Sequence, residues 1–103
     1  MSEGVEEEES MYATIRSYSG GGAFADAIAE REQDVRNVIG SIDGFRAYYV
    51  VRAEDGVTTI SVFDDQAGAE ASTGAAADYV RENLADVAPG PPEVTTGEVV
   101  LSF

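Results

Sequence analysis

The side chains able to do chemistry in this chain form a short inventory. Its 103 residues include no Cys, no His and no Trp, and all six basic residues are Arg. Thiolate and imidazole metal sites, a Schiff-base lysine and a histidine general base are therefore excluded. Hydroxyl groups, carboxylates, amides and the permanent charge of arginine remain. We expect no bound metal and no cofactor.

Arg16 and the tyrosines are the main candidates for contacting a substrate. The charge of Arg16 could hold an acidic or enolate oxygen, or it could form a salt bridge between subunits. The tyrosines could line a pocket or simply pack in a dimer core. Tyr48 and Tyr49 point to opposite faces of a strand, so at most one can line a cavity. The predicted substrate-binding set is Arg16, Tyr18, Tyr12, Tyr49, Ser61 and Phe63, and no catalytic residue is identified.

Three other patterns have simpler explanations than a functional site. Asp64 and Asp65 could bind a hard cation or act as acid and base, but capping of the following helix explains them more simply. The glutamates at 6–9 form a solvated run. The glycines at 20–22 lack the spacing of a nucleotide-binding loop, so we interpret them as a turn.

The charge balance limits the partners that this chain can have. Twenty acids against six arginines give a net charge of −14. Such a chain is a poor ligand for nucleic acids or for anionic membranes, which bind clustered basic residues. We find no membrane-spanning stretch and no signal peptide, and we expect a cytoplasmic location. Residues 1–10 hold five of the acids and are predicted to be a disordered tail, with one domain over 11–103.

The composition is typical of a protein from a salt-rich cytoplasm. It combines the acid excess and the lack of Lys with 15 Ala and 12 Val against only two Leu. At molar salt the Debye length falls to about 3 Å, so like charges hardly repel one another. An ordinary acidic mesophilic protein is the alternative interpretation.

Hydrophobic periodicity predicts six elements. Residues alternate as in strands over 11–18, 45–53, 57–64 and 93–103, and recur at helical spacing over 23–42 and 66–87. Gly74, inside the second helix, predicts a close approach or a bend. The order β-α-β-β-α-β predicts a ferredoxin-like α+β fold with a four-stranded antiparallel sheet and two helices on one face.

Two helices leave the other face of the sheet uncovered. We expect Met11, Ala13 and Ile15 under the helices, and Tyr12, Thr14, Arg16 and Tyr18 on the far face. A second copy would then pack sheet to sheet, giving a homodimeric barrel with Arg16 in the cavity between the two sheets. Stacking of single-stranded RNA on the aromatic rings is the alternative, and the acidity disfavours it.

Segments 12–18, 42–49, 61–72 and 79–84 together resemble the antibiotic-biosynthesis monooxygenase superfamily, the dimeric α+β barrel proteins, over residues 11–103. The chain lacks the His and Trp of the haem-degrading members, the proximal His of the chlorite-type enzymes and the Trp of the quinone-forming oxygenases. It is most similar to the short, uncharacterised branch of the superfamily.

The resemblance implies a homodimer that binds a small aromatic or quinone-like molecule, with cofactor-free monooxygenase as the enzymatic interpretation. Arg16 and Tyr18 would orient the oxygens of a substrate that, once deprotonated, itself gives an electron to dioxygen. The alternative is a non-catalytic structural or regulatory dimer whose cavity is filled by side chains. An open pocket between sheet and helices, lined by Arg16 and tyrosines, would favour ligand binding.

Overall fold

The four strands form one antiparallel sheet. The structure, a computed structural model, describes residues 10–20 and 22–103, so the predicted acidic tail lies outside the described residues except for Ser10. Its elements are β1 (Met11–Ser19), α2 (Gly22–Glu30), α3 (Glu32–Ile39), β2 (Phe45–Ala53), β3 (Gly56–Phe63), α4 (Gln66–Asn83) and β4 (Glu93–Val99). The strand order β2-β3-β1-β4 confirms the predicted ferredoxin-like α+β fold.

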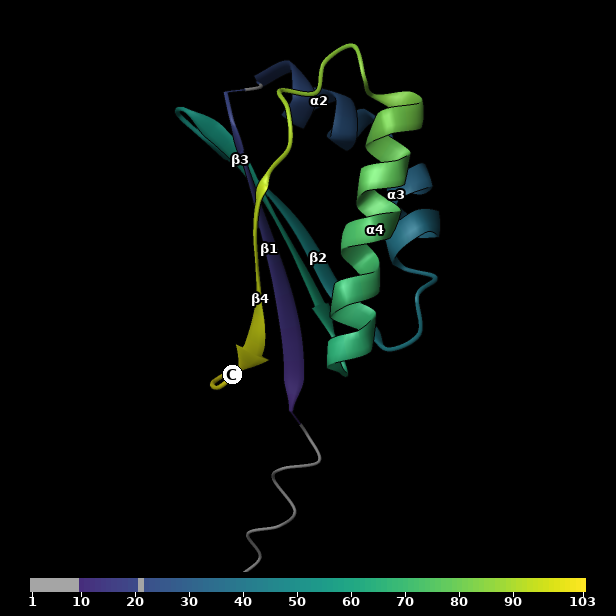
Figure 1. The fold of residues 1–103 in the computed structure, drawn as a ribbon, viewed down its shortest axis with the longest axis vertical. Coiled ribbons are helices and arrows are strands. Elements are labelled where there is room, and N and C mark those ends of the chain that lie inside the picture. Colours follow the sequence, from purple (N-terminus) through teal and green to yellow (C-terminus); the bar gives the residue numbers. More distant parts are fainter. Residues whose placement is uncertain (1–9, 21) are drawn as a thin grey trace, which may run out of the picture.

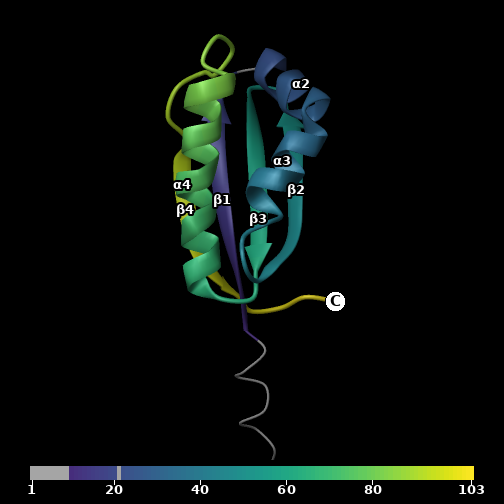
Figure 2. The ribbon, with the colours of Figure 1, turned by 90° about the vertical axis from the view of Figure 1, so that its right-hand side faces the viewer.

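The helices all lie on one face of the sheet (Figure 1). Seen from the helix side, α4 crosses β1 and β4, while α2 and α3 cover β2 and β3 (Figure 2). Two apolar clusters fill the layer between helices and sheet, one around Phe24 and Tyr18 and the other around Phe63 and Ile39. In the described part of the chain, no helix is long and apolar enough to cross a membrane.

The two acids before α4 have separate roles. The Asp65 side chain accepts a hydrogen bond from the backbone N–H of Gly68 at 2.9 Å, so Asp65 is the N-cap of α4. Asp64 instead forms an ion pair with Arg46 on β2. Capping at this position, predicted from the sequence for one of the two acids, is therefore confirmed for Asp65.

α4 packs tightly against the sheet at Gly68. A Cβ atom at this position would lie 2.8 Å from Cδ2 of Phe63 and 3.0 Å from the carbonyl oxygen of Asp43. Gly74 has no such neighbour within 4 Å, so the close approach predicted there is wrong. Contact is made six residues earlier, directly over the buried ring at the end of β3.

Three predicted elements differ from the structure by more than a residue. The helix predicted over 23–42 is two helices, because Arg31 leaves the helical conformation with φ −110° and ψ 36°. This break lets Ile28 join the first apolar cluster and Ile39 the second. The second predicted helix ends at Asn83 rather than at residue 87, and β4 ends at Val99 rather than at residue 103.

The predicted assignment of the sheet faces is also wrong. Thr14, Arg16 and Tyr18 lie beneath the helices and are at most 6% exposed, whereas Ile15 is 38% exposed on the far face. Alternation sorts the side chains of a strand into two sets, but it does not say which set is covered. Hydroxyl groups supplied by β3 and α4 accept hydrogen bonds from the arginine, which makes its burial possible.

Candidate functional site

The Arg16 side chain lies at the centre of a buried polar cluster between the sheet and α4. It is 1% exposed. Its Nη2 donates to the hydroxyl of Ser61 on β3 at 2.7 Å. Its Nη1 donates to the hydroxyls of Ser72 and Thr73 on α4, at 3.2 and 3.3 Å. All three partners are neutral.

Arg16 differs in this respect from the other five arginines, each of which has a carboxylate within 4.0 Å: Arg31 with Asp34, Arg36 with Glu32, Arg46 with Asp64, Arg52 with Asp26 and Arg81 with Asp78. Arg16 has no carboxylate partner among residues 10–20 and 22–103. A guanidinium keeps its charge when buried, and an uncompensated buried charge costs several kcal/mol. The protein therefore holds a positive charge in its interior with nothing on the described chain to neutralise it.

Two polar atoms of the cluster around Arg16 make no hydrogen bond of normal geometry with the described part of the chain. Within the described residues, Arg16 Nε and Thr59 Oγ1 are buried without a hydrogen-bond partner. The Ser72 hydroxyl is already used, because it donates to the carbonyl of Ala69 at 2.6 Å. The group that best complements this cluster is one that only accepts hydrogen bonds, such as an anionic or carbonyl oxygen.

Two tyrosines lie next to the arginine. Burial raises the pKa of Tyr18, and the nearby charge of Arg16 lowers it by less. Burial likewise raises the pKa of Tyr48 more than Arg16 and Thr59 lower it. The Tyr48 hydroxyl lies beside Arg16 and Thr59, but neither Arg16 Nε nor Thr59 Oγ1 makes a hydrogen bond of normal geometry with it. Both phenols stay protonated at neutral pH, so both can donate a hydrogen bond.

A groove of about 420 Å³ between α4 and β4 reaches this cluster. Arg16 and Tyr18 line it together with the apolar side chains Val80, Pro92 and Val94. Arg81 also lines the groove, but it forms an ion pair with Asp78. Mostly apolar walls beside the unpaired charge of Arg16 favour a ligand that is largely hydrophobic and carries one polar end. The groove lies between the helices and the sheet of one chain, so the prediction that Arg16 points into a cavity between two sheets is wrong.

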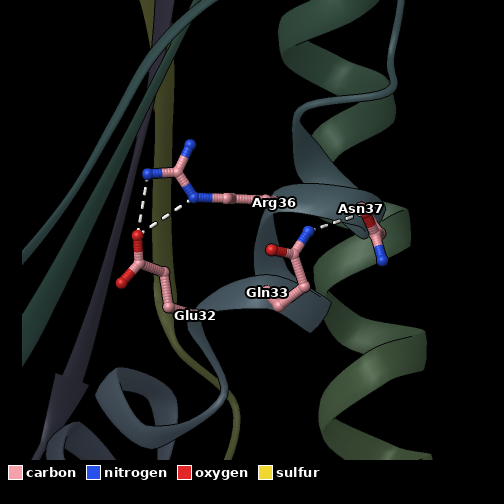
Figure 3. Close-up of polar contacts among 4 residues, drawn as sticks. All are labelled: Glu32, Gln33, Arg36 and Asn37. Carbon is pink, nitrogen blue, oxygen red and sulfur yellow. Dashed lines mark hydrogen bonds and ion pairs between the residues drawn. The ribbon is translucent and has the colours of Figure 1, made fainter.

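A second, larger groove of about 750 Å³ lies between α3 and the edge strand β2. Its lining includes Tyr48, Tyr49 and the ion pair that Arg36 forms with Glu32 at 2.8 Å. Figure 3 shows this ion pair on α3 beside the hydrogen bond from Gln33 to Asn37. Unlike Arg16, Arg36 is neutralised by its own helix, and this groove therefore has no uncompensated charge to attract a ligand.

The structure brings together only part of the predicted substrate-binding set. Arg16, Tyr18 and Ser61 belong to the polar cluster or to its groove. Phe63 is fully buried in the second apolar cluster, and Tyr12 packs against that cluster. The Tyr49 side chain is 56% exposed on the far face of the sheet, where it cannot reach Arg16.

Sequence analysis missed four members of the site: Tyr48, Thr59, Ser72 and Thr73. Of the two adjacent tyrosines the predicted set contains Tyr49, whereas the structure places Tyr48 on the helix face. Ser72 and Thr73 did give a signal, because they are adjacent hydroxyl residues in a helix otherwise rich in Ala. No group of three or more carboxylates within the described ranges could hold a metal ion.

Comparison with known proteins adds to this geometry. No protein-family model and no curated protein matches the sequence. Among solved structures, a protein of unknown function from Nitrosomonas europaea matches with a TM-score of 0.70 and 17% identity, covering 93% of this chain and 95% of that one. A monooxygenase from the gene ActVA-Orf6 of Streptomyces coelicolor, in complex with the ligand nanaomycin D, matches with a TM-score of 0.65 and 17% identity, covering 99% and 97%.

A third match is a protein from Bordetella bronchiseptica, named provisionally as an antibiotic biosynthesis monooxygenase, with a TM-score of 0.67 and 16% identity over 88% of this chain and 98% of that one. The fold is that of the antibiotic biosynthesis monooxygenase structures. At these identities the likeness concerns the fold, and a fold can host several activities. The function of this protein therefore depends on the residues that line its own groove.

Proposed function

We propose that this protein binds a small aromatic or quinone-like molecule in the groove between α4 and β4, with an anionic or carbonyl oxygen directed at Arg16. One observation carries the proposal: Arg16 is buried and charged, and its Nε makes no hydrogen bond of normal geometry in the described part of the chain. A ligand oxygen would supply that acceptor and offset the cost of burying the charge.

The walls of the groove suit the rest of such a ligand. Val80, Pro92 and Val94 offer apolar surface, and the Tyr18 ring lies beside Arg16. Burying a flat hydrophobic molecule against these side chains excludes water from the contact between guanidinium and oxygen, which strengthens that contact. The open groove therefore favours ligand binding over a non-catalytic module whose cavity is filled by side chains.

Cofactor-free monooxygenation is the activity that we propose for this site. Arg16 would stabilise the substrate as its enolate or phenolate, which is electron-rich enough to react directly with dioxygen. In the balanced reaction an activated CH₂ becomes C=O, and its two hydrogens leave with the second oxygen atom as water. The shared fold of the Streptomyces coelicolor monooxygenase supports this proposal.

Binding can be tested with pairs of ligands that differ only in charge. Hydroxynaphthoquinones and aromatic carboxylates are compared with their methyl ethers and esters by calorimetry in molar potassium gluconate. We expect the anionic member of a pair to bind at least about tenfold more tightly, which corresponds to about 1.4 kcal/mol. Arg16→Gln should abolish that preference. Arg52→Gln, which removes an exposed arginine paired with Asp26, is the matched control and should retain it.

Oxygen consumption with the ligands that bind then tests the activity. Equal affinity for the anionic and neutral members of a pair, or binding that survives Arg16→Gln, would rule out the proposed site. Tight, Arg16-dependent binding without oxygen consumption would leave a binding protein and exclude the monooxygenase.

We also propose a homodimer formed through the far face of the sheet. This face exposes 38% of Ile15, 56% of Tyr49 and 47% of Val51. Exposed apolar side chains gathered on one sheet face are typical of an interface with a partner. Sedimentation in molar salt should give a dimer for the wild type and a monomer for Val51→Arg. A wild-type monomer would overturn this proposal and leave the groove of each chain intact.

A further inference from the structure

The ligand-free protein has to accommodate the charge of Arg16 before any organic molecule arrives. We propose that a small inorganic anion of the halide class binds at the inner end of the groove against Arg16, and that it competes there with the organic ligand. Only the competition rests on the proposed function. Halide binding itself follows from the cluster.

The unmatched donor of Arg16 determines which kind of anion fits. Arg16 Nε is buried without a hydrogen bond of normal geometry in the residues that the structure describes, and the Thr59 hydroxyl, in the same state, lies outside the lining of the groove. A halide has no hydrogens, and it accepts hydrogen bonds from any direction. One ion can therefore use several N–H and O–H donors whose directions would not match the lone pairs of a single carboxylate. The three neutral hydroxyls already bound to the guanidinium leave its positive charge in place.

The groove walls favour a weakly hydrated ion. Val80, Pro92 and Val94 cannot replace the water molecules that sulfate or fluoride would have to shed. Chloride and bromide lose their hydration shells at lower cost, so we expect bromide to bind at least as tightly as chloride and both to bind more tightly than fluoride.

Elsewhere on the described chain, the positive charges are already paired with carboxylates. The other five arginines have carboxylate partners, and the net charge of −14 repels anions from the surface. Arg81 lines the same groove but is paired with Asp78, so halide binding should depend on Arg16. Added salt screens the exposed acids more strongly than it screens a buried contact. High ionic strength therefore does not remove the preference of the halide for Arg16.

Chloride and bromide NMR line widths test this inference, because exchange with a protein-bound site broadens the halide signal. Ionic strength is held constant with potassium gluconate, whose polyhydroxylated anion would have to shed its hydration shell against the apolar groove walls. We expect saturable broadening with the wild type, a loss of at least about fivefold with Arg16→Gln, and wild-type broadening with Arg52→Gln. Equal broadening for the wild type and Arg16→Gln would overturn the inference.

A second variant tests the site without changing its charge. Val94 lines the groove and is 43% exposed, so Val94→Trp should fold and cover the inner end. We expect it to reduce the halide broadening as Arg16→Gln does, and unchanged broadening would contradict a site inside the groove.

Competition separates this inference from the proposed function. An organic anion that binds the groove should remove the halide broadening, and chloride should weaken the affinity of that organic anion at constant ionic strength. Arg16-dependent broadening that no organic anion displaces would uphold the halide site and count against the proposed function. Organic binding that is insensitive to chloride, without halide broadening, would do the reverse.

Discussion

The Arg16 guanidinium donates a 2.7 Å hydrogen bond to the hydroxyl of Ser61 on the neighbouring strand, and both side chains are at most 1% exposed. A permanent charge is thus held by a neutral partner inside the protein. The two ends of this hydrogen bond should have opposite effects on stability, because one end carries the cost of the charge and the other reduces it.

Replacing the charged end should stabilise the fold. Arg16→Met removes the uncompensated charge and fills similar volume, and this gain outweighs the lost hydrogen bonds to hydroxyls. We expect the free energy of unfolding to rise by about 1 kcal/mol in urea denaturation. Ser61→Ala leaves the charge and removes its shortest hydrogen bond, and should lower that free energy by about 2 kcal/mol. Destabilisation by both substitutions to the same extent would contradict this account of the cluster.

Two glycines of α4 provide a matched pair for testing the contact between helix and sheet. Gly68→Ala places a methyl group 2.8 Å from the fully buried ring of Phe63, which cannot move aside, and should cost about 1–3 kcal/mol. Gly74→Ala meets nothing within 4 Å and should stabilise the helix by about 1 kcal/mol. Thermal unfolding of both variants checks this, and a neutral Gly68→Ala would mean that α4 can lift from the sheet.

Stability should decline at alkaline pH through the buried tyrosines. Burial raises the pKa of Tyr48 in the folded state above its ordinary value near 10. The native state therefore holds the phenol proton more tightly than the unfolded state does. The resulting stability is fully present below about pH 10 and is lost as the pH rises through the folded-state pKa.

Unfolding midpoints measured from pH 8 to 11 test this expectation, a range set by the ordinary tyrosine pKa near 10. Tyr48→Phe should flatten the alkaline decline. The control is Tyr49→Phe, whose side chain is 56% exposed, and it should keep the wild-type slope. A decline of equal steepness in Tyr48→Phe would assign the effect to other groups.

Salt dependence tests the interpretation drawn from composition. With a net charge of −14, the folded surface repels itself in dilute buffer, and molar salt screens that repulsion. We expect the midpoint of thermal unfolding, followed by circular dichroism, to rise strongly from dilute buffer to molar potassium chloride. Potassium gluconate should give most of the same rise, since screening does not require halide binding. Full stability in dilute buffer would be incompatible with adaptation to salt.

Much of the fold could be predicted from local sequence patterns. The bounds of β2 agree with the alternation over 45–53, and the tight turn before Gly56 joins β2 to β3 as the Asp-Gly pair predicts. These features depend on neighbours in sequence, where hydrophobic period and turn chemistry act directly. The helix break at Arg31 carries no glycine or proline, so no local signal marks it.

The site was harder to predict, because it depends on which face of the sheet the helices cover. An arginine on a strand suggests an exposed face, but the hydroxyls of Ser72 and Thr73 allow it to be buried. A bulge between Phe45 and Ala47 also moves Phe45 to the helix face, where its ring packs against Phe63. Such long-range compensation cannot be read from the period of one strand.

Gly68 has a role that extends beyond packing. It lies one helical turn before Ser72, whose hydroxyl accepts a hydrogen bond from the guanidinium. The absence of a side chain at Gly68 therefore sets the distance between α4 and the sheet, and with it the hydrogen bond between Arg16 and Ser72. A substitution at Gly68 would therefore change the affinity for a ligand, although Gly68 does not line the groove.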